Sequence, residues 1–325
     1  MILAKCCSHY LFSFTTFRHM ILPDKLQQLF HFTLHDELML LFNIPIYAIF
    51  IPLEIILSNF NHLKFYSIKE TITNIYLNLL NAGIDFLLRI LVSLTVLNFF
   101  YQYRSPIHLD PVLYWVLLVL AEDFLFYIEH YVDHHCRLFW AVHVTHHSSP
   151  EYNLTTGFRS SVFMPMYRFF YFIPLVLLNF SPADIFFAYA ITQSYGILVH
   201  TRAIKKLPRW IEYIFVTPSH HRVHHASNIP YLDKNMGMLL IIWDRMFGTF
   251  TEERADEVPV YGIVKPIDKP HHPVHIVMHE WIAIAKDMSK KVPFATKLKY
   301  LINPPGWSHD GSTQTAKQMQ DKLSK

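Results

Sequence analysis

Histidines in three short clusters are the residues of this sequence best suited to metal chemistry. The first cluster has the spacing HxxxH, and each of the two later clusters has the spacing HxxHH. Residues three and four apart share one face of a helix, so each cluster aims two or three imidazoles at one point. Eight imidazoles are about the number that a pair of metal ions needs. The eight are His130, His134, His143, His146, His147, His221, His224 and His225.

The alternative is chance, because the chain has 22 histidines. A single HxxxH would usually be a coincidence, whereas three clusters in order beside apolar segments favour metal binding. His200, at the end of an apolar segment, is either a ninth ligand or a simple interfacial histidine. Cys136 could be a soft ligand, but the histidines already suffice. The three cysteines form no CxxC pair and indicate a reducing compartment.

The ligand type narrows the metal and its chemistry. Sites made of imidazoles suit iron, zinc or copper. The sequence has no HExxH motif, so the metalloprotease arrangement is absent. Structural zinc is closed and four-coordinate, and eight or nine histidines exceed one such site. Two metals with open positions beside lipid therefore indicate oxygen chemistry on an apolar substrate.

Composition indicates a membrane protein. Of 325 residues, 52% are hydrophobic, with 27 Phe and 18 Tyr. The net charge of +3 is small, and no basic patch interleaved with aromatic residues indicates nucleic acid. Residues 1–37 lack the apolar region and cleavage site of a signal peptide, and their role cannot be read from the sequence.

The first apolar segments predict membrane helices. Residues 38–57 are long enough for one span. Residues 71–103 are too long for one ordinary span, and predict either one tilted helix or two helices that break near residues 81–83. Within this segment Asp85 and Arg89 lie one turn apart, which favours a mutual salt bridge.

A helix over residues 112–132 begins as an apolar segment and ends in the first histidine cluster. Asp123 lies two turns before His130 on the same face, where it could orient that imidazole. The alternative for Asp123 is a residue at the membrane interface. For Glu129 and Asp133 we expect a solvated helix face.

The remaining chain predicts a hairpin and a soluble end. Residues 163–180 and 182–200 form two further apolar segments, and Ser181 before Pro182 is a strong helix start. Residues 251–325 are charged and soluble in character, with an amphipathic helix. We interpret its regularly spaced histidines as one helix face rather than as ligands. They are His271, His275 and His279.

Three further residues are candidates around the metals. Asp244 could orient an imidazole, or it could serve local capping. Asn153 and Arg159 follow the second cluster, where they could line a substrate or cofactor pocket. Helix capping is an equal alternative for Asn153.

The prediction is an all-α integral membrane protein. We expect four to six membrane-embedded helices, capped on the cytosolic face by the helical histidine site. Residues 1–37 would be an N-terminal segment, 38–250 the membrane-embedded catalytic domain and 251–325 a soluble tail.

The order HxxxH, HxxHH, HxxHH resembles the fatty acid hydroxylase and sterol desaturase superfamily. The stretches TPSHHRVHHASN and IIWDRMFGTF are similar to its alkylglycerol monooxygenase branch, and the resemblance covers residues 44–250. It implies that the eight cluster histidines bind two irons, and Asp123 matches the acid before the first histidine of that branch. His135 stands where the branch has a glutamate, a departure that bears on its cofactor tetrahydrobiopterin.

The resemblance implies hydroxylation of a lipid C–H bond with O2. The ether-linked carbon of an alkylglycerol is the target in that branch, and fatty acyl or sterol-like lipids are alternatives. Electrons would come from tetrahydrobiopterin or from a redox protein. The membrane would be the endoplasmic reticulum or a bacterial inner membrane. Two other functions stay open, a lipid desaturase on the same scaffold and a membrane metal-binding protein without turnover.

Overall fold

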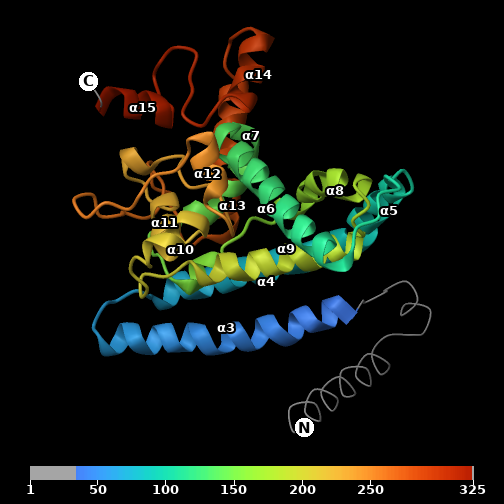
Figure 1. The fold of residues 1–325 in the computed structure, drawn as a ribbon. Coiled ribbons are helices and arrows are strands. Elements are labelled where there is room, and N and C mark those ends of the chain that lie inside the picture. The colour runs from blue at the N-terminus through green and yellow to red at the C-terminus, as the bar shows by residue number, and fades with distance from the viewer. Residues whose placement is uncertain (1–33, 324–325) are drawn as a thin grey trace.

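The computed structural model describes residues 34–323, and every regular element in this range is helical (Figure 1). The predicted N-terminal segment 1–37 lies outside the described residues except for its last four. The all-α prediction is therefore confirmed over the described part of the chain.

Helix α3 (Leu34–Phe60) covers the predicted first span and continues through two internal prolines. Helix α4 (Ile68–Leu88) runs through one π-helical turn, η1 (Arg89–Ser93), into α5 (Leu94–Tyr101). Of the two alternatives for residues 71–103, the structure shows one continuous helical run, and its irregular turn lies at η1 rather than near residues 81–83. The helix continues at the earlier position, where the Asn81 side chain donates to the Ser161 carbonyl. The predicted salt bridge is present, with 2.5 Å between Arg89 and Asp85.

Helix α6 (Pro111–His135) leads from the apolar part of the molecule to the histidines. Asp110 caps it by accepting the backbone N–H groups of Val112 and Leu113, and Pro111 fits the first turn, where its missing N–H costs nothing. Among the described residues, α6 is the one helix both long and apolar enough to cross a membrane. After Cys136 the chain turns into α7 (Arg137–His147), which packs against α6.

Residues 163–180 do not form the predicted single helix. They form two 3₁₀ turns, η3 (Met164–Met166) and η4 (Arg168–Phe172), and one short helix, α8 (Ile173–Leu177). Prolines inside this stretch remove backbone donors, and the buried ion pair of Arg168 with Glu129 draws a polar group into the middle of an apolar segment. The second half of the hairpin is as predicted: α9 (Pro182–Leu198) starts at Ser181, whose hydroxyl accepts the N–H of Asp184.

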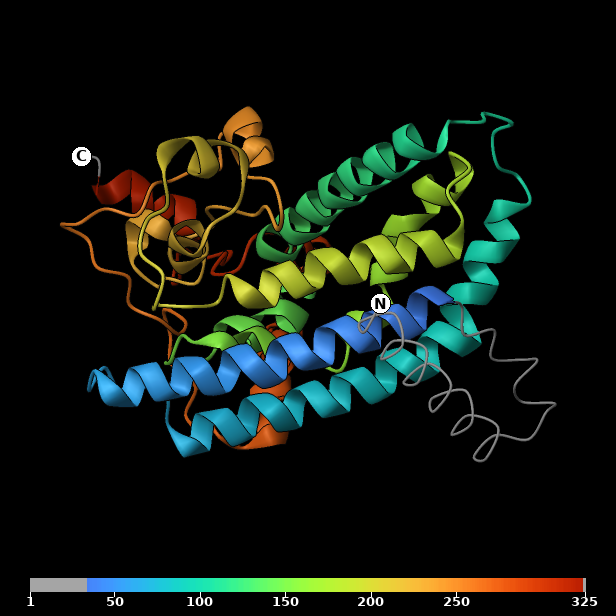
Figure 2. The same ribbon diagram turned by 60° about the horizontal axis from the view of Figure 1, so that its bottom comes forward.

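The apolar helices pack around one core. Leu97, Leu118, Leu175 and Ile185 are buried together and come from α5, α6, α8 and α9. Figure 2 shows α3, α4, α6 and α9 running lengthwise through the molecule, with the histidine-bearing segments at one end.

Short elements complete the histidine end of the molecule. They are η2 (Leu154–Phe158), α10 (Arg209–Ile214), α11 (Pro218–His224), η5 (Ile229–Tyr231) and α12 (Ile242–Phe247).

The region predicted as a soluble tail contains three helices, α13 (Pro273–Met288), α14 (Phe294–Ile302) and α15 (Ala316–Leu323). Helix α13 buries Ile276 and Ile284, whereas His271, expected on one helix face with His275 and His279, lies before the helix begins and contacts Glu70 at 3.1 Å. Helix α13 packs against α7, where Arg137 forms ion pairs with Glu280 and Asp287. The C-terminal region is therefore attached to the helix that carries the second histidine cluster.

Candidate metal centre

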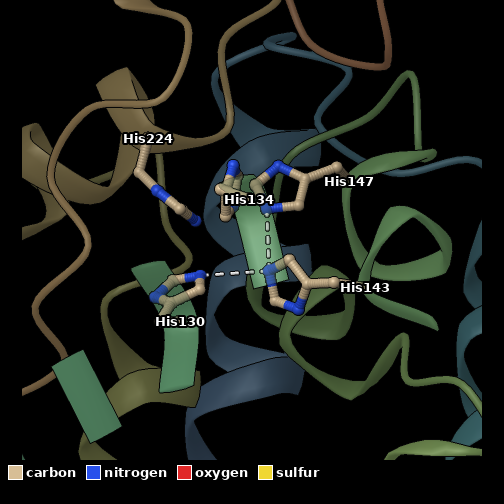
Figure 3. Close-up of side chains that lie close together, drawn as sticks. All are labelled: His130, His134, His143, His147 and His224. Carbon is tan, nitrogen blue, oxygen red and sulfur yellow. Dashed lines mark hydrogen bonds between the residues drawn. The ribbon is translucent and has the colours of Figure 1, made fainter. Parts of the chain in front are cut away.

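Nine buried or half-buried histidines gather in two groups, and within each group the potential ligand atoms lie within 4.8 Å of one another. The first group is His130, His134, His143, His147 and His224. The second group is His146, His200, His221 and His225. Figure 3 shows the five rings of the first group turned toward a common centre. All eight cluster histidines fall in these groups, and His200 joins them.

Each HxxHH motif divides its imidazoles between the two groups. On α7, His143 and His147 are four residues apart and face the first group, whereas His146 faces the second. We expected each cluster to aim at one point, which is wrong for both HxxHH motifs. A single residue step rotates a side chain by about 100° around a helix axis, so adjacent histidines separate. The two motifs together thus build two neighbouring sites.

The inner nitrogens are spaced as metal ligands would be. The Nε2 atoms of His130 and His147 lie 3.0 and 3.1 Å from Nε2 of His143. In the second group, Nε2 of His200 is 3.0 Å from that of His225 and 3.1 Å from that of His221. Two nitrogens about 2.1 Å from one ion and at right angles are about 3.0 Å apart. The spacing of these converging nitrogens therefore fits a pair of metal ions.

The outer nitrogens fix the orientation of the rings. Nδ1 of His130 lies 2.7 Å from the Met236 carbonyl, and Nδ1 of His200 lies 2.6 Å from the Gly196 carbonyl. A carbonyl oxygen only accepts, so each Nδ1 carries the proton and each Nε2 presents its lone pair to the centre. Nδ1 of His146 and of His224 meet carbonyls in the same way.

Burial keeps these imidazoles neutral. It lowers the pKa of His146 from its ordinary 6.5 to about 4, and it lowers the pKa values of His147, His221 and His225 further. Neighbouring imidazoles act in the same direction, because one charged ring disfavours another. A metal ligand must be neutral, so the site is ready to bind at neutral pH.

Residues 115–249 match the fatty acid hydroxylase family. This range contains all nine histidines of the two groups. Helices α13 to α15 lie outside the matched range.

Relatives with curated names agree with this assignment. The chain is 37% identical to human alkylglycerol monooxygenase over 197 residues, covering 59% of this chain and 42% of the human protein. It is 42% identical to the alkylglycerol monooxygenase of Danio rerio over 154 residues, covering 47% of this chain and 33% of that protein. The ornithine lipid hydroxylase OlsE of Rhizobium tropici is 30% identical over 154 residues, which cover 47% of this chain and 46% of OlsE. The chain thus spans less than half the length of these relatives. No solved structure matches it.

Asp123 and Asp244 accept backbone and indole N–H groups rather than an imidazole N–H, contrary to prediction. Asp123 accepts the backbone N–H groups of Leu239 and Leu240 and the indole N–H of Trp243. Asp244 accepts the N–H groups of Met236 and Gly237. Asp244 can act on His130 only indirectly. It accepts the N–H of Met236, and the carbonyl of Met236 accepts the Nδ1–H of His130.

The carboxylates that face ligand rings are Asp233 and Asp133. Nδ1 of His134 lies 3.1 Å from Asp233, and Nδ1 of His143 lies 3.6 Å from Asp133. The expectation of a solvated face for Glu129 and Asp133 is wrong, because both are buried. The sequence does carry a local signal for Asp133, because this residue lies on α6 directly before His134. No local signal indicated Asp233, which lies 99 residues beyond its partner.

Asn153 and Arg159, predicted to line a substrate or cofactor pocket, are engaged in structural contacts. Asn153 caps η2 through a reciprocal capping box with Thr156, which was its alternative role. Arg159 is 0% exposed, and its guanidinium forms a 3.1 Å ion pair with Glu70. Its carbonyl is 2.9 Å from Nδ1 of His146, so Arg159 supports the second group through its backbone.

His135 and Cys136 belong to neither histidine group. The His135 ring is half-buried and stacks on Tyr131 with 3.9 Å between ring centroids. The thiol of Cys136 points to the Leu301 carbonyl at 3.5 Å. The departure at position 135 therefore lies beside the centre, with its ring turned to Tyr131.

A cavity of about 970 Å³ joins the first group to the C-terminal region. Its lining includes three histidines of the first group, His134, His147 and His224, and no member of the second. Trp140 also lines it, and the opposite wall comes from α13 and from the segments around α15. We call this cavity the vestibule. Its size falls in the range of small-molecule sites.

Proposed function

We propose that this protein is a membrane-bound di-iron monooxygenase that hydroxylates a C–H bond of a lipid with O2. The observation that carries the proposal is the pair of buried imidazole groups inside the residue range that matches the fatty acid hydroxylase family. The first group would hold one iron and the second group the other. Iron, when bound, would supply the activation of O2.

The alkylglycerol monooxygenase relatives favour the ether-linked carbon of an alkylglycerol as the target. One oxygen atom would enter the C–H bond, and the other would leave as water with two electrons and two protons from a donor. Hydroxylation next to an ether oxygen gives a hemiacetal, which breaks into an aldehyde and an alcohol. The donor would be tetrahydrobiopterin or a redox protein.

The chain's own residues would position and shield this chemistry. Outer-nitrogen hydrogen bonds hold the rings of His130, His146 and His200 before any ion arrives. Such preorganisation lowers the cost of binding. The buried histidines exclude bulk water, and the vestibule offers a route by which a small polar co-reactant reaches the first group.

We also propose that residues 38–250 form a membrane-embedded catalytic domain. Large apolar side chains are exposed along α3, α4 and α6, among them Ile56, Leu79 and Val112. Contiguous exposed apolar surface of this kind is costly in water and is satisfied by lipid. The metal centre would face the cytosol, at the endoplasmic reticulum or a bacterial inner membrane.

The test combines metal content with turnover on detergent-purified protein. We expect about two irons per chain, since two groups need two ions, and O2-dependent aldehyde release from a fluorescent alkylglycerol. Omitting tetrahydrobiopterin tests the donor, and an ornithine lipid tests the alternative suggested by the similarity to OlsE. An alkene product would instead indicate a desaturase. Absence of iron after anaerobic reconstitution would refute the proposal.

A further inference from the structure

The outer nitrogens of the two histidine groups differ in part of their partners, because His130 and His224 of the first group meet backbone carbonyls as the second group does, whereas two other rings of the first group face carboxylates. In the first group, His134 and His143 face the carboxylates of Asp233 and Asp133. In the second group, the outer nitrogens of His146 and His200 meet backbone carbonyls. A carboxylate that accepts the outer N–H makes an imidazole a stronger donor to a metal than a neutral carbonyl does. The two positions are therefore chemically unequal.

Asp133 is the more deeply buried of the two carboxylates, and its 3.6 Å contact with His143 is longer than the 3.1 Å hydrogen bond between Asp233 and His134. It is 1% exposed, whereas the side chain of Asp233 is 25% exposed and screened by solvent. The hydroxyl of Tyr167 donates to one oxygen of Asp133 at 2.8 Å, which leaves the other oxygen facing His143. Nδ1 of His143 has no hydrogen-bond partner among the described residues, so Asp133 is the acceptor nearest to it.

His143 is also central to its group. Its Nε2 is the atom that both His130 and His147 approach within 3.1 Å. A change in the donor strength or orientation of this one ring is therefore felt by the whole first group. The first group has in addition five imidazoles against four in the second.

We propose that Asp133, held by Tyr167, is a positioning residue that makes the first group the tighter of the two metal sites. The proposal rests on the two-metal centre proposed above. Asp133 is buried and lies directly before His134 in the sequence.

The experiment is a Co²⁺ titration of metal-free, detergent-purified protein, followed by the ligand-field absorption of bound Co²⁺ against a competing chelator. The wild-type protein should bind two ions in two resolved steps. Asp133→Asn keeps the shape of the side chain but removes its charge, and it should weaken the tighter step about 10–100-fold while leaving the weaker step unchanged. Tyr167→Phe should weaken the same step by less.

Matched variants assign the steps and control for packing. His143→Ala should abolish the tighter step, and His200→Ala should abolish the weaker one. Glu129→Gln removes another buried charge one turn earlier on α6, where the carboxylate pairs with Arg168 rather than with an imidazole. Both steps should stay at wild-type strength in that variant.

The outcomes separate this inference from the proposed function. If Asp133→Asn left both steps unchanged, or weakened both equally, the positioning role would be wrong while the two-metal centre stood. If His200→Ala removed the tighter step, the order of the sites would be reversed and the proposal overturned. If the wild-type protein bound no Co²⁺, Zn²⁺ or Fe²⁺, the metal centre itself would be refuted. Poor folding of Asp133→Asn would leave Tyr167→Phe as the deciding variant.

Discussion

The two histidine groups draw on the same helices, α7 and α11, yet their surroundings differ. The first group borders the vestibule and is backed by two carboxylates and two carbonyls, whereas no member of the second group lines the vestibule and its His146 and His200 are backed by carbonyls. A motif can therefore bring histidines together without fixing how each candidate metal site behaves. Behaviour depends on the partners of the outer nitrogens, which come from elsewhere in the chain.

The largest expected effect comes from removing a ligand at the centre of the first group. His143→Ala should lower O2-dependent lipid turnover more than about 100-fold and reduce the iron content, because a ligand loss exceeds the effect of losing its support. His135→Ala is the matched control, since this neighbouring histidine stacks on Tyr131 outside both groups. Equal loss in both variants would show that the grouping of histidines does not predict function.

The second prediction concerns the support of the second group. Arg159→Met leaves the buried carboxylate of Glu70 without its cation, and should lower the free energy of unfolding by about 3–5 kcal/mol. The Arg159 carbonyl also receives His146, so on heating the second ion should be released before the first. Thermal unfolding and metal release, followed together in detergent, measure both effects.

The control for this prediction is an exposed ion pair. Lys206 and Glu252 are 43% and 65% exposed and lie 2.8 Å apart. Lys206→Met should cost less than about 1 kcal/mol, because solvent screens such pairs. An equal loss of unfolding free energy in Arg159→Met and Lys206→Met would contradict the role assigned to the buried pair of Arg159 with Glu70.

The third prediction is a loss of stability in acid by the metal-free protein. Burial lowers the pKa values of His146, His147, His221 and His225 below the unfolded value of 6.5. As pH falls below about 6.5, the unfolded state takes up protons that the folded state refuses, so stability is lost downward from there. Each group contributes up to about 1.4 kcal/mol per pH unit. The thermal midpoint, measured with a chelator from about pH 8 to about pH 5, should fall with pH.

Bound metal should change how the stability of the protein depends on pH. Ions compete with protons for the same nitrogens, so the loaded protein should resist acid until the metal leaves. A midpoint that is equally insensitive to pH with and without metal would show that these histidines do not stay neutral in the folded state.

The sequence predicted which histidines gather in the fold better than it predicted the groups that hold their rings. The eight cluster histidines follow from helix spacing, which is local, and α6, α7 and α11 form as required. The faces of a helix are decided by what packs against it, so Glu129 and Asp133 could not be recognised as buried from α6 alone. Asp123 lies on the expected helix but meets the segment around Leu239, because that segment covers it.

Residues 163–180 form short turns instead of one continuous helix for a different reason. Apolar composition predicts burial or lipid contact, whereas helix continuity depends on individual residues. Pro165 and Pro174 each lack a donor, and Arg168 turns inward to Glu129. Hydrophobicity averaged over a window of residues does not detect the effects of Pro165, Pro174 and Arg168 on the helix.

The smallest expected effect tests whether the vestibule serves the first group alone. Ala283 lines the vestibule from α13, and Ala285 on the same helix does not. Ala283→Trp should slow removal of the first ion by a water-soluble chelator several-fold. The indole ring would narrow the vestibule, while the histidines of the first group are unchanged. Equilibrium affinities at both sites and release of the second ion should stay the same, and Ala285→Trp should match wild type. Faster or unchanged release of the first ion in Ala283→Trp would mean that ions reach it by another path, and the difference between the two groups would then rest on the carboxylates of Asp133 and Asp233 rather than on the vestibule.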